Sequence, residues 1–363
     1  MKILILSCST GGGHNSCARY VEEELKENNI SCEFKDFFDI VNVKGKDLSE
    51  KLYLSSLGLN GDIFKNVYKL GELYSKTKVT SPVYLVNKLY KKAMAQYVRK
   101  NEFDLVVVSH LFPALTLTAI NRDKRFNKIP FITIATDYEP CPFLEEAKPD
   151  FLIMQKGLED KFIKKGIDKN ILVNSGIPVS SKFIREAHDI KDELGIMKER
   201  VVLIMLGSMG FGRVSEIIHE LLKEDNIKII VVCGSNRDLY NELGRIGDDK
   251  LIVLGFVHNI NSLIYSADIV MTKPGGLSST EVAVMRKPLL HIFPIPGIET
   301  YNANFFNDNG IGIKCDSKDE TIDNCKKLLN DKKKQEEIIR GQKEFINAES
   351  AKDLVKLIME NYK

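Results

Sequence analysis

The chain has 363 residues, of which 44% are hydrophobic and 28% are charged, and its formal net charge is +2. A chain of this length is too long for one average hydrophobic core and suits two domains. Because the net charge is close to zero, the chain lacks the strong basic field that is typical of nucleic-acid-binding proteins, and we expect no nucleic-acid partner.

The first apolar run, KILIL at residues 2–6, predicts a buried strand, and a glycine-rich turn, SCSTGGGHNS, follows it at residues 7–16. After the turn, the spacing of Cys17, Val21 and Leu25 predicts a helix. The run is too short for the core of a signal peptide, and no apolar stretch approaches the roughly 20 residues of a transmembrane helix. Seven scattered cysteines without a C-x-x-C pair are typical of reduced thiols. The sequence therefore predicts a cytoplasmic protein that contacts membranes only peripherally.

The glycine-rich turn does not match the fingerprint of a dinucleotide-binding site. That fingerprint reads G-x-G-x-x-G, whereas the three glycines here are contiguous. Asp36 ends the second predicted strand, so an NAD-dependent oxidoreductase stays open as a distant alternative. The turn ends in His14, where the positive end of a helix dipole favours a neutral imidazole. A neutral imidazole is a competent general base, which makes His14 a candidate catalytic residue.

Residues 45–100 interrupt the pattern of strands with a segment rich in leucine and aromatic side chains. Its second part, residues 65–100, contains nine basic residues and a single acid, Glu72. Basic and aromatic residues interleaved in this way are typical of a segment that lies on an anionic bilayer surface. An ordinary solvated helical insertion would have a similar composition, and both interpretations stay open.

Two polar residues follow the next apolar runs of the first half. His110 ends DLVVVSH, and Asp137 ends PFITIATD. Ligands of open α/β sheets bind at the carboxyl edge, so we expect both side chains near a site. Asp137 either orients a histidine or binds the acceptor, and the same two roles are open to His110. The alternative for each is a polar residue with a local hydrogen bond. The remaining histidines are expected to be structural or at the surface.

The pattern of strand, glycine-rich turn and helix starts again at residues 201–213, VVLIMLGSMGFGR. Continuous apolar strands that alternate with helices indicate parallel sheets covered on both faces. The sequence therefore predicts two doubly wound α/β domains, at residues 1–176 and 177–345. The last segment, residues 346–363, predicts a helix that packs back on the first domain.

The most informative turn of the second half is KPGG, which follows a predicted strand that ends at Thr272. Its glycines and the serines of LSST precede a helix, and free N–H groups, hydroxyls and the helix dipole favour an anion there. Glu281 follows one turn later. A carboxylate beside a phosphate needs a partner such as the vicinal hydroxyls of a ribose, so the pair indicates a nucleotide. The alternative is a plain strand–turn–helix with a glycine for packing.

The order TKPGG…E and then PGxExxNA resembles the donor-binding signature of the monogalactosyldiacylglycerol synthases and the processive diacylglycerol glucosyltransferases. It is similar, more distantly, to the lipid II-forming N-acetylglucosaminyl transferase. TGGGH, SH, TDY, GIPV and GFV fall in the family's order, so the resemblance covers most of the chain. It implies the GT-B fold, in which two Rossmann-like doubly wound domains face each other across a cleft.

The resemblance also implies the roles of donor-binding residues. The backbone of Phe256 and Val257 would hold a uracil, Glu281 the ribose, and Glu299 and Asn302 the sugar. The diphosphate would lie among Gly207, Ser208, Gly210, Lys273, Gly275, Gly276, Ser278 and Ser279. One departure concerns the donor sugar, because Ile298 stands where the family commonly has a glutamine.

Together with these patterns, the resemblance implies an inverting hexosyltransferase that makes a β-glycosyl diacylglycerol at the cytoplasmic face of the cell membrane. The donor is a UDP-sugar and the acceptor is diacylglycerol or a related lipid. His14 takes the proton of the acceptor hydroxyl, and UDP leaves from the opposite face of the sugar. The helix dipole meets the charge on UDP, and the chain has no Asp-x-Asp triplet, so neither a metal nor another cofactor is expected.

Three further alternatives remain from the sequence. They are a transferase of the same fold that acts on another lipid or glycan, a soluble UDP-sugar epimerase, and a nucleotide-sugar-binding module without catalysis. The sequence does not distinguish among the possible hexoses. It also leaves open which of His14, His110 and Asp137 is the base.

Overall fold

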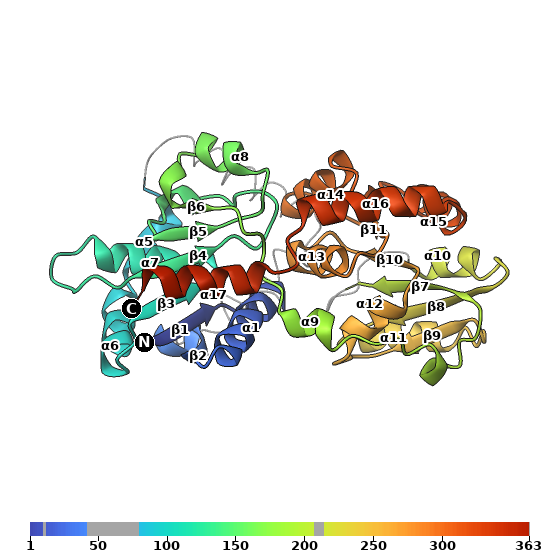
Figure 1. Ribbon diagram of the computed structural model, residues 1–363, viewed down its shortest axis with the longest axis horizontal. Coiled ribbons are helices and arrows are strands. Elements are labelled where there is room, and N and C mark those ends of the chain that lie inside the picture. Colours follow the sequence, from blue (N-terminus) through green and yellow to red (C-terminus); the bar gives the residue numbers. More distant parts are fainter. Residues whose placement is uncertain (10–11, 42–79, 207–213, 363) are drawn as a thin grey trace. The chain divides into compact units, whose positions relative to one another are not determined.

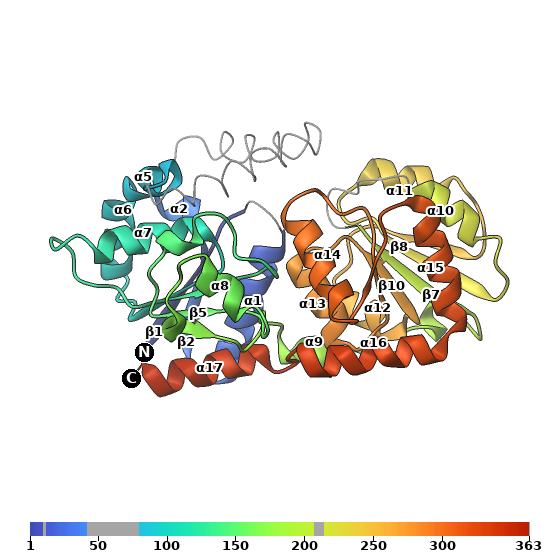
Figure 2. The same cartoon turned by 90° about the horizontal axis from the view of Figure 1, so that it is seen from above.

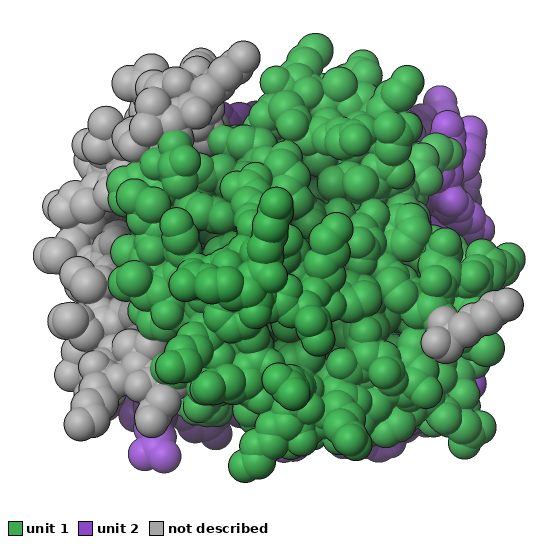
Figure 3. Space-filling model, turned by 90° about the vertical axis from the view of Figure 1, so that its left-hand side faces the viewer, with its two compact units in different colours: residues 1–181, 296–298, 348–363 green, residues 182–295, 299–347 purple. Residues whose placement is uncertain are grey.

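The computed structural model describes residues 1–9, 12–41, 80–206 and 214–362. The chain divides into two compact units (Figures 1 and 3). Unit 1 comprises residues 1–181, 296–298 and 348–363, and unit 2 comprises residues 182–295 and 299–347. Part of the predicted 45–100 insertion and the predicted turn at 207–212 lie outside the described residues.

In its described part, unit 1 is built on one parallel six-stranded sheet with the order β2-β1-β3-β4-β5-β6. The strands are β1 Lys2–Ser7, β2 Ser31–Asp36, β3 Leu105–Val108, β4 Phe131–Ile134, β5 Phe151–Ile153 and β6 Leu172–Val173. The central strands β1, β3 and β4 are buried along almost their whole length. Helices lie on both faces of this sheet (Figure 1), and for this reason the strands are continuous apolar runs rather than alternating ones.

The helices of unit 1 follow from the same apolar periodicity. Helix α1, for example, buries Cys17, Ala18, Val21 and Leu25 on one face. The helices are α1 Gly12–Glu27, α2 Phe37–Val41, α5 Pro82–Lys88, α6 Lys91–Lys100, α7 Leu111–Asn121, α8 Glu159–Lys164 and α17 Ser350–Asn361, with 3-10 turns at η1 Leu144–Glu146 and η2 Lys169–Ile171.

Unit 2 repeats the plan with a parallel six-stranded sheet of order β12-β11-β10-β7-β8-β9. Its strands are β7 Arg200–Met205, β8 Ile227–Val232, β9 Leu251–Leu254, β10 Ile269–Thr272, β11 Leu289–His291 and β12 Ile313–Lys314. Its helices are α10 Val214–Leu221, α11 Arg237–Gly244, α12 Ile260–Ser266, α13 Gly276–Val284, α14 Ile298–Asp308, α15 Lys318–Asn330 and α16 Lys332–Phe345, with η3 Asp192–Leu194 and, at the boundary of the units, α9 Ser181–Arg185.

The C-terminal helix α17 packs against α1, at the other end of unit 1's sequence. Figures 1 and 2 both show the two helices side by side. The face of α17 that includes Leu354 and Ile358 is buried. At its start, the Ser350 hydroxyl donates to the Ile177 carbonyl over 2.9 Å and accepts from the Val179 N–H over 3.3 Å. These bonds attach the helix to the segment that closes the first sheet.

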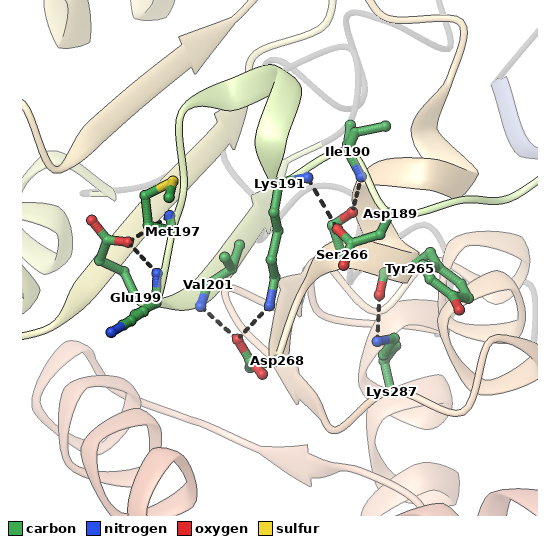
Figure 4. A network of polar contacts seen from close by, with 11 residues as sticks. Asp189, Ile190, Lys191, Met197, Glu199, Val201, Tyr265, Ser266, Asp268 and Lys287 are labelled. Carbon is green, nitrogen blue, oxygen red and sulfur yellow. Dashed lines mark hydrogen bonds and ion pairs between the residues drawn. The ribbon is translucent and has the colours of Figure 1, made fainter.

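In unit 2, polar contacts attach the segment before β7 to the amino ends of the strands (Figure 4). The Asp268 carboxylate accepts from the Val201 N–H over 2.7 Å and lies 3.6 Å from the Lys191 ammonium. The Ser266 hydroxyl accepts from the Ile190 N–H over 2.9 Å. These local contacts fix the amino edge of the sheet, whereas ligands of open α/β sheets bind at the carboxyl edge.

Among the described helices, none combines the length and the apolar character needed to cross a bilayer. Helix α5 nevertheless presents exposed apolar side chains. Leu85, Val86 and Leu89 are 52%, 50% and 77% exposed. Lys88 and Lys92, which lie next to them in the chain, are also exposed.

Candidate active site

The carboxyl ends of β1, β3 and β4 lie next to each other in unit 1, because these three strands are neighbours in a parallel sheet. The glycine-rich turn and α1 follow β1, His110 begins the turn into α7 after β3, and Thr136 and Asp137 follow β4. The three segments that the sequence singles out therefore meet at one edge, as expected for a site in an open α/β sheet.

His14 lies in the first turn of α1 and is half-buried. Its Nδ1 atom is 2.8 Å from the carbonyl oxygen of Ser109 and 2.9 Å from Oγ1 of Thr136. The Ser109 hydroxyl also donates to the His14 carbonyl over 3.0 Å. The imidazole is thus fixed by contacts from the ends of β3 and β4.

His110 is the N-cap of α7, and its Nδ1 accepts from the Phe112 N–H over 3.2 Å. Its ring packs edge-on against His14, with 4.9 Å between ring centroids. Burial, and to a smaller extent the neighbouring His14, hold the pKa of His110 well below its ordinary value. His110 is therefore neutral at pH 7 and a weak proton acceptor.

Sequence reasoning missed Ser109 and Thr136, which contact the His14 ring, and selected the residue after each of them. Asp137 is partly buried, and its pairing with a histidine or with an acceptor stays a prediction. The sequence does show that a polar pair, SH or TD, follows each of these two strands, and this pattern could have indicated Ser109 and Thr136 as well. Every residue has a backbone carbonyl, so the sequence does not indicate which carbonyl contacts His14. The direction of the threonine side chain depends on the backbone conformation.

Asp36 forms hydrogen bonds within unit 1. Its carboxylate accepts hydrogen bonds from the N–H and the hydroxyl of Ser9 and, over 2.8 Å, from the Phe38 N–H. Burial, with a smaller contribution from Asp36, raises the pKa of the Cys8 thiol well above its ordinary value. Because both of its carboxylate oxygens accept these bonds, Asp36 anchors the start of the glycine-rich turn.

In unit 2, the N-cap of α13 is Gly275, which has no side chain with which to cap the helix. The first turn of a helix leaves N–H groups without intrahelical partners, which suits an anion. Ser278 is partly exposed in that turn. Glu281, one turn further along, is 8% exposed. The predicted cradle therefore has the expected local structure at Gly275, Gly276 and Ser278.

Ser279 differs from Ser278, because its side chain is completely buried. Its hydroxyl lies 2.8 Å from Nε2 of His291 on β11, and its N–H donates to the Gly275 carbonyl over 3.0 Å. Burial lowers the pKa of His291 to about 3, so its ring is neutral at pH 7. The contact with His291 holds α13 on the sheet, and the predicted contact of the Ser279 hydroxyl with a diphosphate stays a prediction.

The two motifs of the second half form one cluster. The Lys273 ammonium of TKPGG lies 3.3 Å from the Glu299 carboxylate of PGIETYNA, which also accepts from the Ile295 N–H over 2.8 Å. Asn302, which is fully buried, donates from Nδ2 to the Pro274 carbonyl over 2.9 Å. Helix α14 is thus attached directly to the turn before α13.

The remaining predicted donor residues lie in two loops. Phe256 follows β9 and is 71% exposed, with its ring edge-on to His258 at 5.0 Å between centroids. Val257 is half-buried. Both residues lie on the loop that follows β9, and the predicted contact of their backbone with a uracil stays a prediction. The other loop, with Gly207, Ser208 and Gly210, lies outside the described residues.

Two family models match the chain. Residues 14–179 match monogalactosyldiacylglycerol (MGDG) synthase, and residues 201–358 match the glycosyltransferase family 28 C-terminal domain. The first part of the chain is thus similar to the MGDG synthase model and the second part to the family 28 C-terminal model. The match to the MGDG synthase domain begins at His14. The family resemblance that TKPGG and PGxExxNA indicate is thereby confirmed.

Characterised relatives and solved structures extend this assignment. The processive diacylglycerol beta-glucosyltransferase of Bacillus pumilus is 26% identical over 371 residues, which cover 99% of this chain and 94% of the relative. MurG of Acinetobacter baumannii has a TM-score of 0.64 at 15% identity and covers 99% of this chain and 100% of its own. The UDP-GlcNAc 2-epimerase of Neisseria meningitidis, bound to UDP-GlcNAc, has a TM-score of 0.62 at 12% identity with coverage of 99% and 100%. The predicted GT-B fold is confirmed by these likenesses.

Proposed function

We propose that this protein is a glycosyltransferase that transfers a hexose from a UDP-sugar to diacylglycerol, with inversion, and so makes a β-glycosyl diacylglycerol. The observation that carries the proposal is the cluster in which Lys273, Glu299 and Asn302 join the two donor motifs around the start of α13. Relatives named as processive diacylglycerol beta-glucosyltransferases, which match over 94% of their own length, support the acceptor.

We assign the binding of the UDP-sugar donor to groups around the start of α13, according to their chemical character. The N–H groups of its first turn and the Ser278 hydroxyl suit the diphosphate. Lys273 adds a positive charge beside them, and its pairing with Glu299 holds its ammonium in place. Glu281 suits the ribose hydroxyls, and Phe256 and Val257 the uracil. The positive end of the helix meets the charge that develops on UDP, so we propose transfer without a metal.

The acceptor step is assigned to His14. Its ring removes the proton of the acceptor hydroxyl while the oxygen forms a bond to the anomeric carbon, and the bond from that carbon to the diphosphate breaks. UDP leaves with the electron pair. His110 is the weaker candidate for the base, because its Nδ1 already accepts a hydrogen bond and its pKa is lowered.

A lipid acceptor must be reached at a bilayer, and helix α5 supports peripheral attachment of the protein there. Leu85, Val86 and Leu89 are exposed apolar side chains, and Lys88 and Lys92 are exposed cations beside them. Apolar side chains that enter the interface and lysines that meet anionic headgroups together favour binding to an anionic surface. We propose the inner face of the cell membrane as that surface.

The experiment that tests the proposed function uses liposomes that contain diacylglycerol and each labelled UDP-hexose in turn. The lipids are then separated by chromatography. We expect a labelled glycolipid with one of the donors, and none with His14→Ala. Release of UDP without labelled lipid would refute the lipid acceptor. Conversion of the free UDP-sugar to its epimer would favour the epimerase alternative, which the likeness to an epimerase keeps in view.

A further inference from the structure

Nδ1 of His14, the ring nitrogen that does not take the acceptor proton in the proposed mechanism, contacts two oxygen atoms. They are the Ser109 carbonyl oxygen at 2.8 Å and Thr136 Oγ1 at 2.9 Å. Ser109 and Thr136 are 2% and 7% exposed. These contacts are therefore made by buried groups, and they determine which ring nitrogen carries the proton.

A carbonyl oxygen only accepts hydrogen bonds, so a nitrogen that lies 2.8 Å from it must carry the hydrogen. Nδ1 of His14 is therefore the protonated nitrogen, and the threonine hydroxyl accepts a second branch of the same bond. Shared bonds of this kind are common in proteins. The neutral ring then has its lone pair on Nε2.

The neighbouring His110 ring is the opposite tautomer. Nδ1 of His110 accepts from the Phe112 N–H, so in neutral His110 the proton is on Nε2. His110 is neutral at pH 7 because burial lowers its pKa. The two rings, 4.9 Å apart, thus differ in tautomer, and only His14 has its Nε2 free of a proton.

We propose that Thr136 is a positioning residue, which with the Ser109 carbonyl holds His14 as the Nδ1–H tautomer so that Nε2 removes the proton of the acceptor. This inference rests on the proposed function. The carbonyl cannot be removed by a side-chain substitution, whereas the hydroxyl can. Thr136 is therefore the residue through which the arrangement is tested.

The chain offers a matched control on the strand that leads to Thr136. Thr133 on β4 is also buried, at 2% exposed, and its hydroxyl has no hydrogen-bond partner among the described residues. Thr133→Val and Thr136→Val each replace a buried hydroxyl by a methyl group, at positions three residues apart. Only the second removes a contact with His14. Thr136→Ser restores the hydroxyl and completes the set.

The first measurement is the nitrogen NMR spectrum of histidine-labelled protein at a pH where the rings are neutral, with His14 assigned by the signal lost in His14→Asn. We expect the wild-type signal of an Nδ1–H tautomer, and a larger fraction of the other tautomer in Thr136→Val. A wild-type ring protonated at Nε2 would overturn the proposal. This measurement does not depend on activity, so it stands even if the protein transfers no sugar to lipid.

The second measurement is steady-state kinetics of glycolipid formation. We expect kcat of Thr136→Val to fall roughly tenfold, a part of the 10²–10⁴-fold that a positioned base contributes. KM for the UDP-sugar should stay within about twofold, since Thr136 does not belong to the donor site. Thr136→Ser should recover most of kcat. A Thr136→Val variant as active as Thr133→Val, or a Thr136→Ser variant as impaired as Thr136→Val, would overturn the proposal.

Discussion

At the scale of single residues, adjacent letters in a motif have different roles because a helix rotates by about 100° per residue. Ser278 and Ser279 are neighbours in LSST, yet the first is partly exposed and the second is fully buried against His291. A sequence identifies the helix start and its hydroxyls. It does not give the rotation of the helix, which decides the hydroxyl that a ligand can reach.

The buried contact of His291 predicts a pH dependence of stability. The pKa of this ring is about 3 in the folded protein and about 6.5 in an unfolded chain. A lowered folded pKa means that the unfolded state binds the proton first, so stability falls as the pH drops below about 6.5. Between pH 7 and pH 5 the loss from this one group is about 2 kcal/mol.

The measurement is urea unfolding of the wild type and His291→Gln at both pH values. The amide of the variant does not titrate, so we expect its free energy of unfolding to fall less between pH 7 and pH 5, by the amount given above. His110 titrates alike in both proteins and cancels in the comparison. Equal pH dependence in the two proteins would contradict a buried, neutral His291.

At the scale of elements, the strands and the edge at which the site lies follow directly from the sequence. Continuous apolar runs such as DLVVVS predict buried parallel strands, and the rule for carboxyl edges places His110 and Asp137 beside the glycine-rich turn. The link between α14 and the KPGG turn was not predictable. It depends on Asn302 reaching the Pro274 carbonyl across 28 positions of sequence.

The attachment of α16 to α13 gives a prediction at this scale. The Arg286 guanidinium donates to the Ala283 carbonyl at the end of α13 and to the Gln342 and Ile346 carbonyls at the end of α16. Its removal leaves these acceptors without a charged donor, so Arg286→Ala should lower the free energy of unfolding by about 2 kcal/mol.

The matched control is Arg340→Ala, because Arg340 is exposed on α16. We expect this variant to stay within about 0.5 kcal/mol of the wild type in the same urea titration. If Arg286→Ala were no less stable than the control, Arg286 would not connect the two helices energetically.

At the scale of the whole molecule, the chain repeats one strand–turn–helix plan in two units, and we propose a different role for each. Unit 1 holds His14 among oxygen atoms, and unit 2 joins the donor motifs around α13. Ile298, where the family commonly has glutamine, is the position we would exchange first to change donor preference.

Membrane attachment is a prediction at this scale. Leu85→Ser with Leu89→Ser removes two exposed apolar side chains from α5, so affinity for anionic vesicles should fall by at least about tenfold. Met359→Ser on α17, at a side chain 54% exposed, is the control and should bind as the wild type does. Sedimentation with vesicles measures both. Equal affinity of the two variants for the vesicles would contradict membrane binding through α5.

The decisive experiment determines the anomeric configuration of the glycolipid that we expect when the protein is incubated with a UDP-hexose and diacylglycerol. Proton NMR of the purified product reads this configuration from the coupling of the anomeric hydrogen. A single displacement with His14 as base predicts the β-anomer. An α-anomer, or no glycolipid with any UDP-hexose, would contradict the account.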